Sequence, residues 1–81
     1  MYFVYILKSL KDNGYYVGMT ANLESRLKYH NRQRVRSTKN RVPLEVVYHE
    51  KFETRAKARE REKYFKSYKG SKEKLTILEN L

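Results

Sequence analysis

The stretch YFVYILKS (residues 2–9), followed by LKDNG and then by YYVGM (residues 15–19), decides the fold of this chain. Aromatic and branched residues dominate the first segment, and such residues are typical of strands. The segment is apolar on both faces of the pleat, which predicts a strand that is covered on both sides. Asn13-Gly14 favours a tight turn because both residues accept a positive φ. The stretch therefore predicts a β-hairpin, whose register the sequence leaves open.

Further elements follow the hairpin, and residues that commonly cap helices mark their beginnings: Asn22, Thr54 and Ser71. The expected elements are a helix over 22–31, a basic loop up to Pro43, a strand over 44–52, a helix over 55–68 ended by Gly70, and a short last helix docked through Leu75, Leu78 and Leu81. The order β-β-α-β-α-α predicts a single α+β domain over residues 1–81. We expect a three-stranded, mainly antiparallel sheet flanked by helices.

The composition limits the function. The chain has 81 residues, and its 19 Lys and Arg against 9 Asp and Glu give a formal net charge of +10. A domain of this size has no room for a deep cofactor chamber, and its positive charge favours a polyanionic partner such as nucleic acid. The lack of cysteine excludes disulfides, thiolate zinc sites and cysteine nucleophiles. No segment resembles a membrane span or a secretion signal, so we expect a cytoplasmic protein with no membrane partner.

Two ionisable residues share the predicted inward face of the first helix. Leu23, Arg26, Leu27 and His30 have the i, i+3, i+4, i+7 spacing of one helical face. A charge in a core-facing position needs a partner, because burying it alone is costly. In a structural interpretation, the Arg26 head group lies in water at the edge and His30 is hydrogen-bonded inside. In a functional interpretation, both residues belong to a site.

The second helix places a carboxylate on its inward face. At about 100° per residue, Glu62 falls near Ala58 and Phe65, whereas Glu60 falls on the opposite side. In a structural interpretation, Glu62 forms a salt bridge with Arg26. In a functional interpretation, a carboxylate, a guanidinium and an imidazole converge on one side of the sheet, an arrangement suited to phosphate chemistry.

Two tyrosines on the neighbouring strands, Tyr5 and Tyr16, are candidates to join this cluster, and Gly18 follows closely. Strand tyrosines belong to a core or an interface more often than to an active site. A glycine near the end of a strand either lets a ligand approach the backbone or relieves crowding beside the next helix.

Taken in order, these residues resemble the signature of the GIY-YIG nucleases, especially the small stand-alone bacterial proteins of that superfamily. The two signature triplets correspond to Phe3-Val4-Tyr5 and Tyr16-Val17-Gly18. The positions that follow match as well, and they are Thr20, Asn22, Leu23, Arg26, His30, Ala58 and Glu62. The similarity extends from Tyr2 to about Lys69. Met19 stands where some relatives carry a lysine, so that position offers no ammonium group.

The resemblance implies a metal-dependent phosphodiesterase built on a compact sheet of three antiparallel strands. By position, it gives Tyr16 the role of general base or water-orienting phenol, with Tyr5 supporting its hydroxyl. Arg26 would stabilise negative charge on the scissile phosphate, and Glu62 would hold one divalent cation, Mg2+ (or Mn2+). His30 occupies a position near the nucleophile.

The identity of the general base stays open at the level of the sequence. A free tyrosine has a pKa near 10, so Tyr16 would act at neutral pH only beside positive charge such as Arg26 and a metal ion. If that charge is lacking, His30 is the better base, because a free imidazole is half neutral at about pH 6.5.

A basic segment follows the first helix. Residues 26–41 contain seven Lys or Arg and no acidic residue. We expect the last five to hold a nucleic-acid backbone by charge, with little base specificity, and these are Arg32, Arg34, Arg36, Lys39 and Arg41. A mobile, solubilising loop is the alternative. Most basic residues of the second helix are expected to face water.

The leading hypothesis is a metal-dependent endonuclease that acts on DNA in preference to RNA, in DNA repair or in the processing of branched or damaged DNA. The alternative is a nucleic-acid-binding module that keeps the fold but has weak or no catalysis. The small size also predicts that a protein partner or dimerisation supplies substrate specificity.

Overall fold

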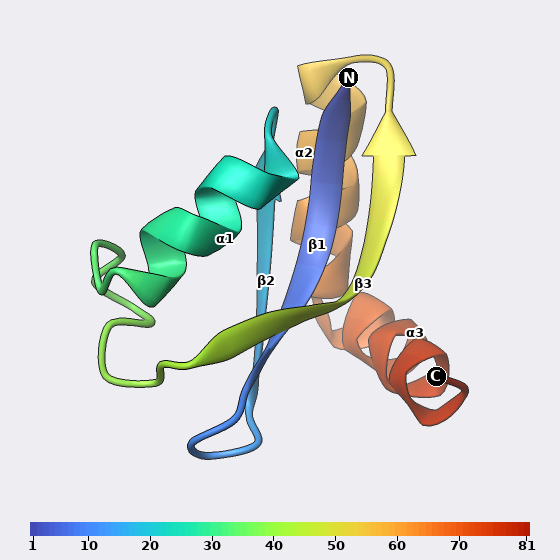
Figure 1. Cartoon of the computed structure of the whole chain (residues 1–81). Helices are drawn as coiled ribbons and strands as arrows, with labels where there is room; N and C mark the ends of the chain where they lie inside the picture. The colour runs from blue at the N-terminus through green and yellow to red at the C-terminus, as the bar shows by residue number, and fades with distance from the viewer.

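The computed structural model describes all residues, 1–81, and confirms the predicted α+β fold and its order of elements. The elements are β1 (Tyr2–Ser9), β2 (Tyr15–Thr20), α1 (Leu23–Asn31), β3 (Leu44–Phe52), α2 (Arg55–Phe65) and α3 (Tyr68–Glu79). The strands form one antiparallel sheet in the order β2-β1-β3. Helix α1 covers one face of the sheet and α2 covers the other (Figure 1). No helix is both long and apolar enough to cross a membrane.

The hairpin turn sets the register that brings the two signature strands together. Asn13 adopts a positive φ of 61°, as predicted, whereas Gly14 does not, so the turn is not a two-residue Asn-Gly turn. The resulting pairing places Tyr5 opposite Gly18 and Leu7 opposite Tyr16. The sequence left this register open. In the structure, it brings both signature tyrosines within reach of the same helix, α1.

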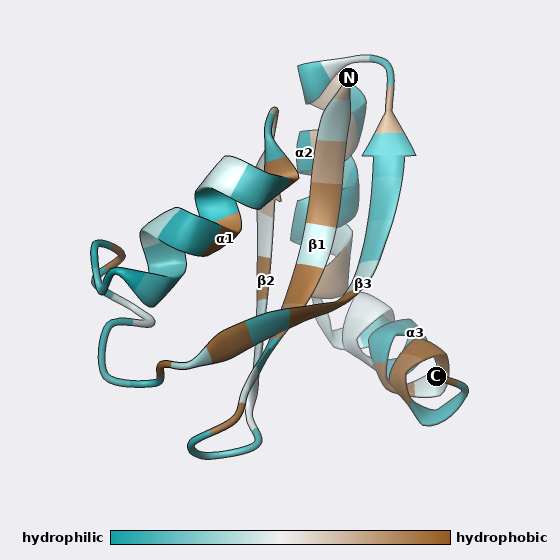
Figure 2. Cartoon of the chain, viewed as in Figure 1, coloured by the Kyte–Doolittle hydropathy of each residue, from teal (hydrophilic) through white to brown (hydrophobic).

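The central strand β1 is buried on both faces, as predicted. Val4 and Ile6 pack with Phe65 on the α2 side, whereas Tyr5 and Leu7 face α1. Figure 2 shows the resulting apolar band along β1, between helices that are mostly hydrophilic. The sheet thus supports side chains that project toward both helices.

The boundary between the last two helices differs from the prediction. Helix α2 ends at Phe65, and Ser67 caps α3 by accepting a hydrogen bond from the Gly70 amide at 3.1 Å. A Cβ on Gly70 would collide with the Tyr64 carbonyl carbon and oxygen. Gly70 therefore permits a close approach of α3 to the end of α2, and it does not terminate α2.

Helix α3 docks through a face that was only partly predicted. Ile77 and Leu78 pack against the core on the α2 side, whereas Leu75 and Leu81 are more than half exposed. The face of α3 that contacts α2 consists of Gly70 and the residues one and two helical turns after it. Leu75 lies off this stripe, and Leu81 lies beyond the end of the helix.

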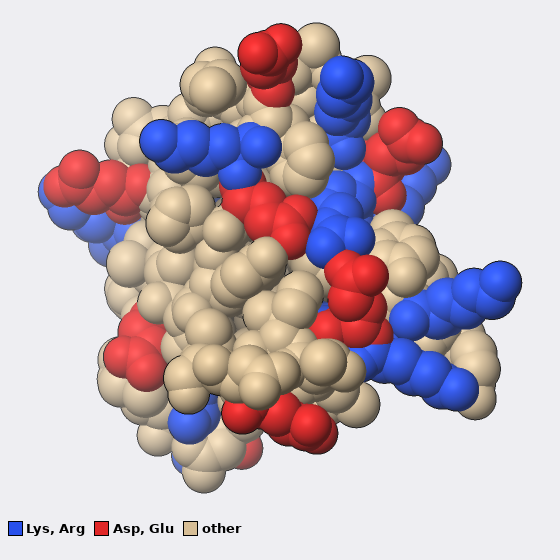
Figure 3. Space-filling model, turned by 90° about the vertical axis from the view of Figure 1, so that its right-hand side faces the viewer, with Lys and Arg blue, Asp and Glu red and all other residues tan.

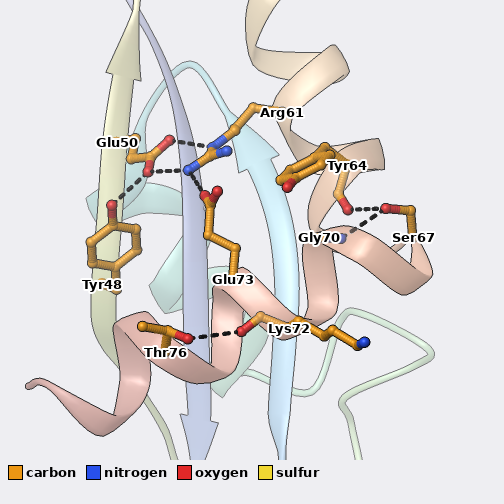
Figure 4. Close-up of polar contacts among 9 residues, drawn as sticks. All are labelled: Tyr48, Glu50, Arg61, Tyr64, Ser67, Gly70, Lys72, Glu73 and Thr76. Atoms are coloured by element: carbon orange, nitrogen blue, oxygen red, sulfur yellow. Dashed lines mark hydrogen bonds and ion pairs between the residues drawn. The ribbon is translucent and has the colours of Figure 1, made fainter.

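A network of charged side chains holds α3 against β3 and α2 (Figure 4). Arg61 donates to both carboxylate oxygens of Glu50, at 2.8 and 3.0 Å, and also to Glu73 of α3. Tyr48 donates to Glu50 at 2.5 Å. Burial alone would raise the pKa of Glu50, but the bonds from Arg61 and Tyr48 hold it below its ordinary value. Arg61 is thus an exception to the expectation that most basic residues of α2 face water.

Candidate active site

A buried hydrogen-bonded chain connects the centre of the sheet with the end of α1. His30 Nε2 lies 2.9 Å from the Tyr5 hydroxyl, and His30 Nδ1 lies 2.8 Å from Thr38 Oγ1. His30 and Thr38 are 0% exposed and Tyr5 is 1% exposed. A neutral imidazole has one donor and one acceptor, so one hydroxyl donates to the ring and the other accepts from it. His30 is therefore hydrogen-bonded inside, and Thr38 is a partner that the sequence did not reveal.

Both titratable members of this chain are neutral at pH 7. Burial, reinforced by the positive charge of Arg26, lowers the pKa of His30 to about 4. Burial raises the pKa of Tyr5 above its ordinary value, although Arg26 opposes part of that change. Neither group reaches solvent, so neither is placed to exchange a proton directly with bulk water.

The lowered pKa of His30 predicts a loss of stability in mild acid. Unfolded His30 takes up a proton below its ordinary pKa of about 6.5, whereas folded His30 does so only near pH 4. The folded state is therefore favoured by this group above pH 6.5, and the advantage is lost as the pH falls toward 4. We expect the free energy of unfolding to drop by about 2 kcal/mol between pH 7 and pH 5 from this residue.

Urea unfolding at both pH values, with the wild type and His30→Gln, measures this contribution. The wild type should lose about 2 kcal/mol more than the variant over this pH interval, whatever the stability of the variant at pH 7. Equal losses in the two proteins would contradict the assignment.

Tyr16 lies beside the buried chain but remains partly exposed. Its ring meets His30 edge to face, with ring centres 5.2 Å apart. The Lys66 ammonium lies 5.8 Å from the centre of the Tyr16 ring. The residue that follows α2 thus places a cation near the Tyr16 ring, whereas Met19 offers none. Tyr16 is the signature tyrosine that an external molecule can reach.

Gly18 makes room for the neighbouring signature tyrosine. It lies directly opposite Tyr5 in the hairpin, and a Cβ on Gly18 would lie only 2.5 Å from Tyr5 Cζ. Any larger residue here would displace the Tyr5 ring and with it the hydrogen bond to His30. The crowding that Gly18 relieves therefore comes from the adjacent strand, and not from the next helix.

Arg26 has no carboxylate partner. Its Nε is buried and makes no hydrogen bond, and no ion pair of the structure includes this residue. Its guanidinium lies 5.3 Å from the ring centre of Tyr29. It also lies close enough to Tyr5 and His30 to shift both of their pKa values. A partly buried, uncompensated cation is costly, and a bound anion would offset that cost.

Glu62 faces inward as predicted, but the predicted alternative of a salt bridge with Arg26 is wrong. Its carboxylate Oε2 instead pairs with Lys66, one turn later, at 3.2 Å, while Oε1 accepts no hydrogen bond. Only 18% of the Glu62 side chain is exposed, and its charge acts on Tyr5. Glu60, in contrast, is exposed, as expected.

Glu62 also lines a pocket of about 360 Å3 between the end of β2 and the first half of α2, together with Tyr2, Met19, Thr20, Ala21, Arg55 and Arg59. The chain has no group of three or more His, Cys, Asp or Glu side chains that could hold a metal ion. Mg2+ usually keeps several waters and uses one or two carboxylates plus substrate phosphates. Glu62 therefore fits a water-rich Mg2+ site, and the donor set excludes a preformed cage of protein ligands.

The basic segment after α1 is attached to the fold at several points. The Asn31 side chain makes two hydrogen bonds with the backbone of Leu44, at 3.0 and 2.7 Å, and Thr38 binds His30. Arg41 is half-buried and pairs with Asp12 at 3.1 Å. The other four predicted phosphate ligands are exposed and form no ion pair, and they are Arg32, Arg34, Arg36 and Lys39.

The opposite side of the molecule has a different charge pattern. Figure 3 looks onto the side that carries β3 and α3, and acidic groups there alternate with basic ones around a broad uncharged area. Mixed charge gives a polyanion little attraction. The segment 32–41, with its exposed and unpaired basic residues, lies on the other side of the molecule, next to α1 (Figure 1).

Tyr5, Tyr16 and His30 meet on the α1 side of the sheet, and Arg26 of α1 lies close enough to shift the pKa of Tyr5. Glu62 belongs to α2, which covers the other face of the sheet, although its charge also acts on Tyr5. The candidate site thus combines a buried and a partly exposed tyrosine, a guanidinium without a counter-ion, and a carboxylate that pairs only with Lys66. Groups of these kinds are suited to phosphodiester cleavage.

Comparison with known proteins agrees with this class. The model of the GIY-YIG catalytic domain matches residues 1–75, so the chain belongs to the GIY-YIG family of nucleases. The UPF0213 protein YazA of Bacillus subtilis is 39% identical over 79 residues, which cover 96% of this chain and 79% of that protein. The UPF0213 protein SH2523 of Staphylococcus haemolyticus is 38% identical over 79 residues, covering 96% and 94%.

A third relative, the UPF0213 protein CPE1444 of Clostridium perfringens, is 46% identical over 67 residues, covering 82% of this chain and 71% of that protein. No solved structure matches the chain. The relatives are small bacterial proteins, in agreement with the stand-alone type of the family that the sequence resembles.

Proposed function

We propose that this protein is a metal-dependent endonuclease that hydrolyses phosphodiester bonds in DNA, carried by one domain over residues 1–81. The observation that carries the proposal is the state of Arg26, whose buried Nε has no hydrogen-bond partner and whose charge has no counter-ion beside Tyr5 and Tyr16. A phosphate group is an anion that fits this position, because a guanidinium donates to two phosphate oxygens at once. Arg26 would stabilise the additional negative charge on the scissile phosphate.

We assign the general base to Tyr16. His30 is fully buried and both of its ring nitrogens are engaged, and Tyr5 is buried with its hydroxyl bonded to His30. Tyr16 has access to solvent, and the Lys66 ammonium lies 5.8 Å from the centre of its ring, so Tyr16 is the signature tyrosine that can contact the attacking water. His30 and Tyr5 are then positioning residues. His30 contacts the Tyr16 ring edge to face, and Tyr5 holds His30 through a hydrogen bond.

The metal ion would be held by Glu62. Its free Oε1 and the adjoining pocket leave space for one hydrated Mg2+ or Mn2+ ion, whose remaining ligands would be water and phosphate oxygens. Such an ion supplies charge neutralisation at the phosphate and the leaving oxygen. Lys66 keeps Glu62 oriented through the ion pair on Oε2.

The exposed basic residues Arg32, Arg34, Arg36 and Lys39 would contact the nucleic-acid backbone, and Arg41 would mainly fix the segment through Asp12. No element offers a helix suited to reading a groove, so recognition of backbone or junction shape is expected. A role in DNA repair or in processing branched DNA, a partner or dimer that supplies specificity, and a cytoplasmic location stay predictions.

Substitution of Glu62 tests the proposal directly, and the chain provides a matched control. We expect Glu62→Gln to lower nicking of plasmid and branched DNA by about 100-fold in Mg2+, because the ion loses its carboxylate ligand. Glu60→Gln removes the same charge two residues away from an exposed position and should act like the wild type. EDTA should abolish the wild-type reaction, and excess Mg2+ should partly restore Glu62→Gln.

Metal binding can be followed without any cleavage. Titration of Mg2+ into the wild type should give saturable amide shifts around Glu62, and these should vanish in Glu62→Gln but persist in Glu60→Gln. Nicking that survives Glu62→Gln unchanged would exclude the proposed metal ligand. Tight DNA binding with neither shifts nor nicking would instead identify a nucleic-acid-binding module that has kept the fold.

A further inference from the structure

Two arginines of α2 line the pocket of Glu62, and the catalytic roles above use neither of them. Arg55 and Arg59 face this pocket together with Thr20. Neither guanidinium makes an ion pair or a side-chain hydrogen bond. Both are exposed, and the sequence alone assigned them to the solubilising surface. The structure thus leaves two free cations beside the proposed metal ligand.

The two arginines belong to a longer stripe on α2. Arg55, Arg59, Glu62 and Lys66 have the spacing i, i+4, i+7, i+11, which keeps them on one helical face. At about 1.5 Å per residue, the stripe extends over about 16 Å. It follows the edge strand β2, since Lys66 lies over Tyr16 and the pocket includes Thr20. Three cations therefore flank the one acidic group along the open edge of the sheet.

The first half of α2 is electropositive for a second reason. The first turn of the helix contains no acidic residue, so no carboxylate within that turn offsets the positive end of the helix dipole. Arg55 and Arg59 line the same pocket as Ala21, which lies just before the beginning of α1, whereas the basic segment 32–41 follows the other end of α1. The two basic regions thus lie at the two ends of α1.

We propose that Arg55 and Arg59 bind a backbone phosphate of the substrate strand next to the phosphate that is cut. This inference rests on the proposed function and adds the path of the strand. The nucleic acid runs along α2, past Lys66 and Glu62 to the pocket at the end of β2, while segment 32–41 holds the other flank. The contact is with phosphate, so it is independent of base sequence.

The salt dependence of binding tests this contact without cleavage. The affinity for a labelled DNA oligonucleotide is measured in EDTA by fluorescence anisotropy at several salt concentrations. Each phosphate contact contributes about 0.9 to the slope of log affinity against log salt for duplex DNA, and about 0.7 for a single strand. Because the two arginines bind one phosphate, Arg55→Gln/Arg59→Gln should lower the slope by about 0.7 to 0.9. Both side chains are exposed and unpaired, so the thermal unfolding midpoint should not change.

The control is Lys57→Gln/Lys63→Gln, which removes two charges from exposed positions of the same helix outside the pocket. This control should leave the slope near that of the wild type. Equal slopes for the two double variants, or no change in either, would overturn the inference and leave the proposed endonuclease intact. A wild type that binds neither duplex nor single strand would overturn the proposed function as well.

Discussion

Arg26→Ala should lower the rate of DNA cleavage by about 1,000-fold while leaving the protein folded, because one charge-stabilising group directed at a phosphoryl oxygen supplies a factor of that order. The structure predicts an unusual companion effect. Arg26 is a partly buried cation without a counter-ion, so its removal relieves a desolvation cost. The free energy of unfolding should therefore stay the same or rise as activity is lost.

The His30 ring reports the same charge independently. Arg26 contributes to the lowered pKa of His30, so the Arg26→Ala variant should show a higher His30 pKa when its ring protons are titrated by NMR. This shift verifies that the guanidinium has been removed from the site without disrupting the fold. A kinetic loss with no change at His30 would mean that Arg26 acts from another position.

Lys28→Ala provides the matched control for this arginine. Lys28 belongs to the same helix, is exposed, and pairs with Glu24 at 3.5 Å on the surface. Its replacement should change cleavage less than twofold, because an exposed pair of this kind contributes little. If Arg26→Ala cleaves within tenfold of the wild type, the assignment of the phosphate ligand is wrong.

Tyr16→Phe is expected to have an effect of similar size, about 1,000-fold on cleavage, since it removes the hydroxyl that takes the proton from water. The phenyl ring preserves the edge-to-face contact with His30. Substrate binding and folding should therefore change little, and the loss should appear in the rate of the chemical step under single-turnover conditions.

Tyr15→Phe is the control, because Tyr15 precedes Tyr16 on β2, is exposed, and points to the other face of the strand. The pH profile distinguishes the two candidate bases. Since the pKa of His30 is about 4, a His30 base would give a rate that no longer rises above pH 5. A rate that continues to rise through neutral pH would therefore exclude His30 as the base. A Tyr16→Phe variant with wild-type rates would exclude the assignment.

Local sequence patterns were sufficient for most of the fold. The β-hairpin, its turn at Asn13 and the cap of α1 at Asn22 depend on residues within a few positions of one another. The helix boundary near Gly70 was predicted wrongly, because it depends on a contact between two helices. A glycine after a helix usually ends it, but here the decisive contact is with the Tyr64 carbonyl across the interhelical turn.

The candidate site was likewise predictable from the sequence only in part. Helical periodicity placed Arg26, His30 and Glu62 on inward faces, and the family resemblance joined them to Tyr5 and Tyr16. Periodicity carries no information on distance between elements, so the predicted pairing of Arg26 with Glu62 was wrong. The inward position of Arg61 could have been predicted from the sequence, because Arg61 shares a helical face with Ala58 and Phe65. Its partners, Glu50 and Glu73, could not have been predicted in this way.

The sequence by itself therefore determined the order of elements, the positive charge and the residue types that face inward, because all of these follow from composition and short-range geometry. Only the tertiary structure decided their partners. Packing joined His30 to Thr38, left Arg26 without a counter-ion, and brought Lys66 to Tyr16. These contacts depend on how a sheet and its two helices fit together in space, which the order of residues along the chain does not specify.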